Sequence, residues 1–137
     1  ARAIEYTAFT SCIQTHGDVR HLYDLTDEAQ EIARLYTALH AELLPYMQRL
    51  RKNACETGMA VVRHLVLNYP KDENVYGIND EFMLGDALLV APVLTKDTSE
   101  REVYLPKGAW TKPLSGEVLT GGTHLSVKAS VSQMYVK

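Results

Sequence analysis

The chain has 137 residues, enough to bury the core of one domain or slightly more. Hydrophobic residues at 46% and charged residues at 23% are ordinary for a globular protein, and a formal net charge of −3 gives no electrostatic reason to expect a nucleic-acid partner. No apolar run approaches the length of a membrane-spanning helix, so no membrane partner is expected.

The beginning of the chain predicts a helix, a strand and a loop. Ala1–Phe9 has the pattern of the tail of a helix that opens without a capping residue, as a fragment of a longer protein would. Thr10–Thr15 is partly β-branched and lacks helical period, so we expect a strand, and His16 and Gly17 lead into a polar loop that ends at Leu25. A lone strand of this kind needs a parallel sheet whose other strands lie outside the chain.

A long amphipathic helix is predicted next. Thr26 is a good N-cap, and Asp27 and Glu28 in the first turn favour the helix dipole. Pro45 removes an amide donor and should kink the helix, and Gly58 is placed for a left-handed C-cap. Apolar side chains recur at three- and four-residue intervals, at Ile32, Leu35, Tyr36, Leu39, Leu43, Met47 and Leu50.

The two cysteines, Cys12 and Cys55, have neither a disulfide framework around them nor the spacing of a zinc site. We therefore expect both to be reduced and buried, with no metal and no cofactor. The N-terminus also lacks the apolar segment of a signal peptide, so we expect a cytoplasmic protein.

The rest of the chain is rich in predicted strands. Ala60–Tyr69 is predicted as one strand, and Ala87–Leu94 is an apolar run typical of a strand covered on both faces. Arg101–Leu105 alternates polar with apolar residues, which predicts one solvent-exposed face. Further strands are expected at Ala109–Thr111, Glu117–Leu119, His124–Lys128 and Gln133–Val136, with a tight turn at Gly121 and Gly122. These patterns alone indicate a β-sandwich.

Two sequence segments are more specific than these patterns, namely FMLGDALLVAPVL at residues 82–94 and REVYLPKGAW at residues 101–110. Together they closely resemble the start of the β-sandwich in the family 31 glycoside hydrolases, the α-glucosidase and α-xylosidase family, in which the sandwich follows a (β/α)8 barrel. The segment IEYTAFTSCIQTHG, residues 4–17, is similar to the seventh barrel helix, eighth strand and following His. Residues 31–70 are similar to the eighth helix and first sandwich strand, so the resemblance covers nearly the whole chain.

The resemblance implies an α+β fold with two parts. Residues 1–58 would be the last helix, strand and helix of the catalytic barrel, and residues 59–137 the proximal antiparallel β-sandwich. A complete barrel needs roughly 250 residues, so its remainder would lie in a missing N-terminal portion of the same protein.

His16 is the candidate substrate-binding residue. It follows the predicted strand at the end where (β/α)8 barrels build their active sites. The residue type alone favours an ordinary loop histidine. The resemblance reverses this preference, because the family places a His here that hydrogen-bonds a hydroxyl of the sugar to be cleaved off. Gln14 stands where the family commonly has Arg, a change that would alter the local hydrogen-bond network.

No catalytic residue is assigned within the chain. Glycoside hydrolysis uses two carboxyl groups that flank the scissile bond. Asp18 and Asp24 lie in the His16 loop, but aspartates that favour turns are the simpler interpretation. In the family the nucleophile and the acid/base follow the fourth and sixth strands, which would place both upstream of Ala1. Neither a serine-hydrolase elbow nor a metal-ligand pattern is present.

Aromatic residues on the predicted strands have two interpretations. Tyr104, Trp110 and Tyr135 would suit a sugar platform, but aromatics at alternating strand positions more often pack in a core, and we expect packing. His40 is expected on the surface of the long helix or between helices.

These observations favour the C-terminal part of a retaining α-glycosidase that hydrolyses terminal α-linked glucosyl or xylosyl residues, inactive as this piece. Its partners would be an α-glucoside or α-xyloside and the missing barrel portion. Both a monomer and an oligomer are compatible with the sequence. The alternative is a free-standing β-sandwich module, structural or carbohydrate-binding, with a helical extension. The strand at Ser11–Thr15 favours the first, because a self-sufficient module has no use for an unpaired strand. The sequence does not determine the sugar, the linkage or the source compartment.

Overall fold

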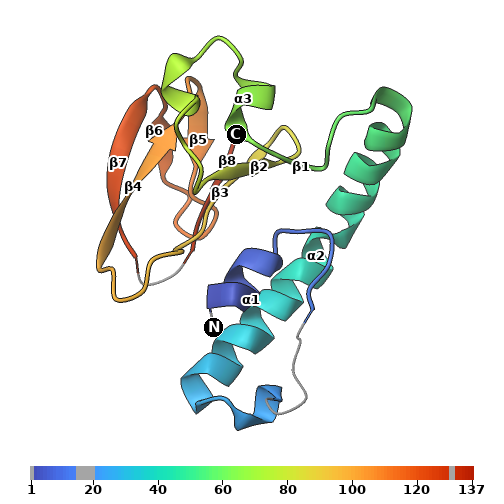
Figure 1. The fold of residues 1–137 in the computed structure, drawn as a ribbon, viewed down its shortest axis with the longest axis vertical. Coiled ribbons are helices and arrows are strands. Elements are labelled where there is room, and N and C mark those ends of the chain that lie inside the picture. The colour runs from blue at the N-terminus through green and yellow to red at the C-terminus, as the bar shows by residue number, and fades with distance from the viewer. Residues whose placement is uncertain (1, 15–20, 130–131) are drawn as a thin grey trace. The chain divides into compact units, whose positions relative to one another are not determined.

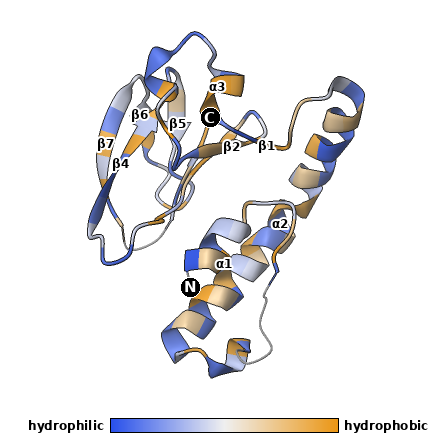
Figure 2. Cartoon of the chain, viewed as in Figure 1, coloured by the Kyte–Doolittle hydropathy of each residue, from blue (hydrophilic) through white to orange (hydrophobic). Residues whose placement is uncertain are grey.

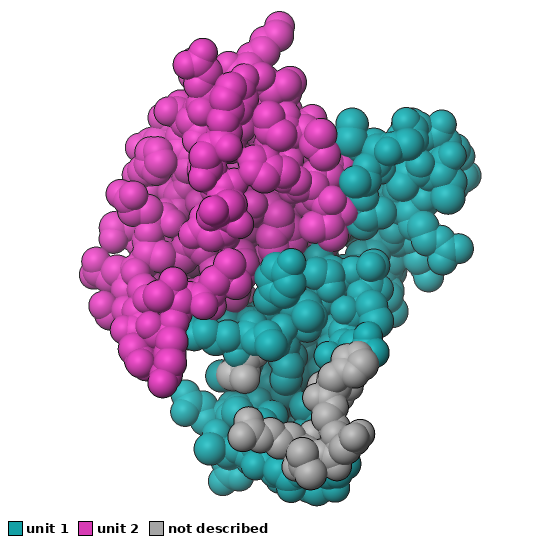
Figure 3. Space-filling view, in the orientation of Figure 1, with its two compact units in different colours: residues 1–61 teal, residues 62–137 magenta. Residues whose placement is uncertain are grey.

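The computed structural model describes residues 2–14, 21–129 and 132–137, and combines helices with antiparallel strands (Figure 1). The chain divides into two compact units, residues 1–61 and residues 62–137, which Figure 3 colours separately. The described part of unit 1 is helical, and unit 2 carries the strands. This mixture agrees with the α+β class expected from the sequence.

Unit 1 is organised around one long helix, α2, which runs from Asp27 to Thr57. The Thr26 hydroxyl accepts a hydrogen bond from the Ala29 amide at 3.3 Å, so the predicted N-cap is confirmed. Gly58 ends the helix with φ of 76°, in the left-handed region, and its amide donates to the Ala54 carbonyl at 2.9 Å. Both predicted ends of this helix are therefore formed, and the helix continues across Pro45.

A short helix, α1 (Arg2–Thr7), packs beside α2. His40 Nδ1 lies 2.8 Å from the Ala8 carbonyl oxygen, which places His40 between the helices. Phe9 meets Tyr36 edge to face, with ring centroids 6.2 Å apart, and burial raises the pKa of Tyr36 to about 12. Hydrophobic and hydrophilic residues are interleaved along α2 in Figure 2. Leu35, which the periodicity assigned to the apolar face, is 62% exposed.

The strand predicted at Thr10–Thr15 is wrong for the part that the structure describes. Residues 10–14 form a bend followed by irregular backbone and are not part of a strand, while Thr15 lies outside the described residues. The Thr10 hydroxyl lies within hydrogen-bond distance of the Thr7 carbonyl oxygen, at 2.8 Å, and so belongs to the end of α1. A parallel strand needs neighbours to accept and donate its backbone hydrogen bonds, and none of the described strands lies in register with this segment.

The burial predicted for the cysteines is also wrong in this chain. Cys12 and Cys55 are both free and both exposed. Cys12 lies in the segment that forms no strand, and among the described residues its side chain is exposed. Cys55 shares the polar side of α2 with Gln48, Arg51 and Lys52, spaced by three and four residues from one another.

Unit 2 consists of a six-stranded antiparallel sheet and a two-stranded one. The larger sheet has the order β1-β2-β3-β8-β5-β6, and β4 pairs with β7 in the smaller. The strands are β1 (Val62–Arg63), β2 (Phe82–Leu84), β3 (Leu88–Ala91), β4 (Glu100–Leu105), β5 (Ala109–Thr111), β6 (Val118–Thr120), β7 (Thr123–Lys128) and β8 (Gln133–Val136). Strand β2 was not predicted. The predicted turn at Gly121 and Gly122 joins β6 to β7.

The single strand predicted at Ala60–Tyr69 is wrong. Only β1 pairs there, and a helical turn, α3 (Leu65–Asn68), follows it. His64 causes the change, because its side chain accepts a hydrogen bond from the Val66 amide at 3.1 Å and so caps the turn. A short apolar run fits either a strand or a helical turn, and the cap decides between them.

The core of unit 2 is formed by side chains from both sheets. Trp110 and Tyr135 are fully buried and Tyr104 is 3% exposed, so the packing role expected for these aromatics is confirmed. The solvent-exposed face predicted for Arg101–Leu105 is wrong at its second half, where three successive residues are buried. Tyr104 is covered because its hydroxyl reaches Asp72, in the turn before η2 (Glu73–Val75).

Candidate functional site

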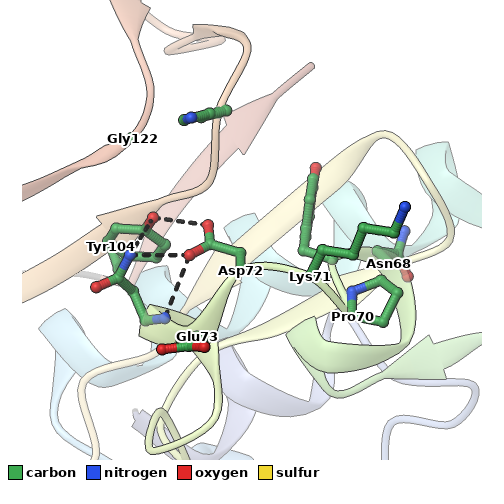
Figure 4. Close-up of a pocket in the computed structure, with 10 residues that line it drawn as sticks. Asn68, Pro70, Lys71, Asp72, Glu73, Tyr104 and Gly122 are labelled. Carbon is green, nitrogen blue, oxygen red and sulfur yellow. Dashed lines mark hydrogen bonds between the residues drawn. The ribbon is translucent and has the colours of Figure 1, made fainter.

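Unit 2 presents an open pocket of about 690 Å³ beside β4 (Figure 4). Residues 68–74, which link α3 to η2, line one side of it. Tyr104, Lys107 and Gly122 line the other side, so the pocket lies between one loop segment and strand β4 with the turns that follow it.

Asp72 is the centre of the polar network in this pocket. Its Oδ2 accepts a 2.7 Å hydrogen bond from the Tyr104 hydroxyl, and its Oδ1 accepts from the side-chain amide of Asn74 at 2.8 Å and from the Asn74 backbone amide at 3.2 Å. Figure 4 shows Asp72 and Tyr104 turned toward one another. The last of these bonds caps η2, which fixes the loop.

The charge state of this network follows from its hydrogen bonds. The Tyr104 hydroxyl lowers the pKa of the Asp72 carboxyl, and the Asn74 donors act in the same direction. Burial raises the pKa of Tyr104, and the hydrogen bond to Asp72 adds to it. Asp72 is thus an ionised acceptor, unlike a general acid, which needs a raised pKa to hold its proton. The network stabilises the loop and gives the pocket a polar wall.

The loop that contains the predicted His16 site is anchored to α2 on its C-terminal side. The Asp24 carboxylate accepts the His21 amide at 2.8 Å, around the short helix η1 (Leu22–Asp24), and the His21 and Tyr23 rings stack with centroids 4.8 Å apart. Gln30 of α2 donates to the Leu25 carbonyl at 2.9 Å. Asp24 therefore stabilises a turn, the simpler of its two interpretations.

His16 and Asp18 lie outside the described residues, so the structure gives no contact for either. The substrate-binding role of His16 stays a prediction. Within residues 2–14, 21–129 and 132–137, no group of three or more His, Cys, Asp or Glu side chains could hold a metal ion. None of the helices in these ranges is long and apolar enough to cross a membrane.

Two carboxyl groups that accept hydrogen bonds from Tyr104, Asp72 and Glu81, were not singled out from the sequence. Asp72 follows Pro70 by two residues and precedes Asn74, a pattern that favours an Asx-type cap, and this signal was available. Glu81 is 5% exposed, directly before β2. Its position at the head of an apolar run was a weaker signal, because a charged residue there is also typical of a strand that begins at the surface.

The comparison with protein families decides what kind of chain carries this fold. A family model described as the glycosyl hydrolase family 31 C-terminal domain matches residues 58–137, more than half of the sequence. The chain belongs to glycosyl hydrolase family 31. The family predicted from the FMLGDALLVAPVL and REVYLPKGAW phrases is thereby confirmed.

Individual relatives of this family 31 chain agree with the match. It is 34% identical to Alpha-glucosidase 2 of Bacillus thermoamyloliquefaciens over 97% of its own length and 17% of that protein. It is 32% identical to an Alpha-xylosidase of Saccharolobus solfataricus, over 95% of the chain and 18% of the relative. A GH31 dextranase of Flavobacterium johnsoniae, solved in complex with glucose, matches 99% of the chain and 18% of its own with 30% identity and a TM-score of 0.91. The chain thus spans less than two thirds of each relative.

Proposed function

We propose that the chain is the C-terminal part of a retaining α-glycosidase that hydrolyses terminal α-linked glucosyl or xylosyl residues. The observation that carries this proposal is the coverage of Alpha-glucosidase 2, in which 97% of the chain corresponds to 17% of the relative. The similarity therefore extends beyond the family-model match at residues 58–137 into the helical unit. A longer enzyme would contribute the remaining length.

In this proposal residues 1–58 are the end of a (β/α)8 barrel and residues 59–137 are the proximal β-sandwich. Exposed apolar side chains on unit 1 support the first part. Tyr23 is 72% and Leu35 62% exposed, and Leu44 is exposed as well. These side chains would be covered if further protein packed against unit 1.

Catalysis would depend on carboxylates upstream of Ala1. A retaining glycosidase uses one carboxylate as nucleophile and a second as acid/base, and forms a covalent glycosyl intermediate. His16 would bind a hydroxyl of the sugar to be cleaved off, and neither Asp18 nor Asp24 would take part in bond breaking. The 137-residue chain alone would then bind sugar poorly and turn over none.

The proposal is tested by assaying two proteins with aryl α-glucoside and aryl α-xyloside: the purified 137-residue chain and the full-length product of its gene. We expect turnover from the full-length protein only, with the α-anomer released first in a time-resolved NMR spectrum. Turnover by the short chain that is lost in Asp18→Asn or Asp24→Asn would place a catalytic carboxylate in the chain and overturn the proposal.

The second candidate, a free-standing carbohydrate-binding module, is favoured by one observation, the polar pocket around Asp72 in a unit that has its own core. Lys107 and the loop of residues 68–74 would contact the sugar. Retention of the 137-residue chain on immobilised α-glucan, abolished by Lys107→Ala and unaffected by the distant Lys128→Ala, would favour the module. Absence of retention would leave the enzyme proposal as the better account.

A further inference from the structure

Glu81 is a buried carboxyl group that connects the two sheets of unit 2. It directly precedes β2 of the larger sheet, and its Oε1 accepts a 2.8 Å hydrogen bond from the Tyr104 amide of β4, in the smaller sheet. Strand β4 pairs with β7 along one edge, so amides on its other edge need different acceptors. Glu81 supplies one of them.

The charge of this carboxyl group is only partly balanced by its surroundings. The Arg101 guanidinium lies 3.7 Å from Glu81 Oε1, but it makes closer contacts with the Asp80 carboxylate, at 2.9 Å, and with the Pro92 carbonyl. Glu81 Oε2 is buried and has no hydrogen-bond partner among the described residues. A buried carboxylate with one oxygen unsatisfied is costly, whereas the neutral acid is much less so.

The other groups that face Glu81 do not remove this cost. Asp80 brings a second negative charge next to it in the chain. The Tyr135 hydroxyl of β8, close enough to feel the charge of Glu81, is itself buried without a hydrogen-bond partner in the described part of the chain. Tyr104 contributes its amide from β4. Among the described residues, Arg101 is therefore the one cation acting on a site that also holds a neighbouring carboxylate.

We propose that Glu81 is a proton-dependent latch between the two sheets of unit 2. Its burial against β4 costs little while it is neutral, and ionisation favours opening of β4, because a buried carboxylate with one unsatisfied oxygen gains more from water than its hydrogen bond to the Tyr104 amide supplies. The latch goes beyond the glycosidase proposal and does not depend on it. It would make the attachment of β4, and with it the wall of the pocket that contains Tyr104, tighter in weakly acid solution than above neutrality.

Burial raises the pKa of Glu81 from 4.5 to about 7, against the opposing effects of the Tyr104 amide and Arg101. The folded state therefore holds its proton where the unfolded state has lost it. The stabilisation is fully present below pH 4.5, declines as the pH rises toward 7, and has levelled off above it. Relative to a variant that cannot titrate here, the folding equilibrium constant should fall by up to a few hundredfold, about tenfold per pH unit, over this window.

The test is amide hydrogen exchange at Tyr104, from pH 5 to pH 8, in the 137-residue chain and in Glu81→Gln. The glutamine keeps a carbonyl oxygen to accept the amide and cannot ionise. Glu102→Gln removes an exposed carboxyl from the same strand and is the matched control. We expect the protection factor of Tyr104 to fall with pH in the unmodified chain and in the control, relative to Glu81→Gln at each pH. Parallel curves for all three proteins would overturn the proposal.

A second measurement covers the case in which Glu81→Gln does not fold. The unmodified chain, labelled with ¹³C at the glutamate carboxyl carbons, would be titrated by NMR with the Glu81 resonance assigned through Phe82. A midpoint well above the ordinary glutamate value, accompanied by a shift of the Tyr104 amide, would support the latch. A midpoint at the ordinary value would overturn it, whatever the variant does.

Discussion

Tyr104 is bonded at both ends, because its hydroxyl donates to Asp72 at 2.7 Å while its backbone amide donates to Glu81 at 2.8 Å. One residue of β4 therefore holds two carboxylates that the sequence separates by nine positions. Asp72 belongs to the loop that lines the pocket and Glu81 to the start of β2. Tyr104 therefore links the pocket loop to the start of β2 through two separate hydrogen bonds.

We expect Tyr104→Phe to lower the free energy of unfolding of the chain by about 1–2 kcal/mol. The change removes a hydrogen bond to a charged acceptor and leaves the ring and its packing in place. Urea denaturation followed by circular dichroism measures it. Tyr76→Phe is the control, since its hydroxyl donates to the Pro70 carbonyl from a side chain that is 56% exposed, and it should cost about 0.5 kcal/mol. Equal losses in the two variants would contradict the role given to Asp72.

Gly121→Ala should destabilise unit 2 by about 1–3 kcal/mol or more. A Cβ atom at Gly121 would lie 2.0 Å from the Pro106 carbonyl oxygen, which also accepts the Trp110 indole N–H at 2.7 Å. Backbone must therefore move around the buried tryptophan. Gly77→Ala is the matched control, because a Cβ there meets nothing within 4 Å, and it should stay within about 0.5 kcal/mol. Thermal unfolding of the two variants decides, and similar melting temperatures would rule out the close approach.

Hydrogen exchange should separate the segment before the loop from the strands. We expect amides in β3 and β8 to exchange slowly, because the two strands pair with each other, β3 is buried throughout and Tyr135 of β8 is fully buried. Cys12 and Ile13 should exchange rapidly in a dilute sample of the chain, because they have no strand partner. Slow exchange at these two residues would contradict this expectation, and protection that grows with protein concentration would indicate pairing with a second copy.

His16→Ala in the full-length enzyme should lower kcat/KM by roughly tenfold to a few hundredfold. Loss of one hydrogen bond to a buried sugar hydroxyl is worth on the order of 1–3 kcal/mol. The melting temperature should stay nearly unchanged, since a residue at the mouth of a barrel contributes little to the core. An ordinary packing histidine predicts the reverse, a lower melting temperature with unchanged kinetics, so both are measured on the same variant.

Elements that carry their own signals were predicted well from the sequence. The helix α2 has a cap at Thr26, a period and a left-handed glycine at Gly58, all of them local, and β5 and β8 agree with their predicted bounds. The strand at Thr10–Thr15 was wrong because none of the described strands pairs with residues 10–14. The strand at Ala60–Tyr69 failed because one side chain, His64, caps a turn inside an apolar run.

The site was predicted less well, for a different reason. His16 was identified from family context, and its residue type alone would not have marked it. Asp72 and Glu81 both accept hydrogen bonds from Tyr104, which lies 32 and 23 residues away along the chain. No spacing pattern in the sequence predicts contacts of this kind. Burial of Glu81 in particular depends on how the two sheets meet, which is a tertiary property.

The exposed thiols of Cys12 and Cys55 can report whether other protein packs against unit 1. They are the only cysteines in the sequence, so a maleimide reagent can be counted on each without any mutation. Labelling of both in the short chain, and shielding of Cys12 alone in the full-length protein, would map the side of the helical unit against which the rest of the enzyme lies. The same reagent, applied during refolding, would measure when Cys12 becomes protected, and so when that side of the helical unit is covered.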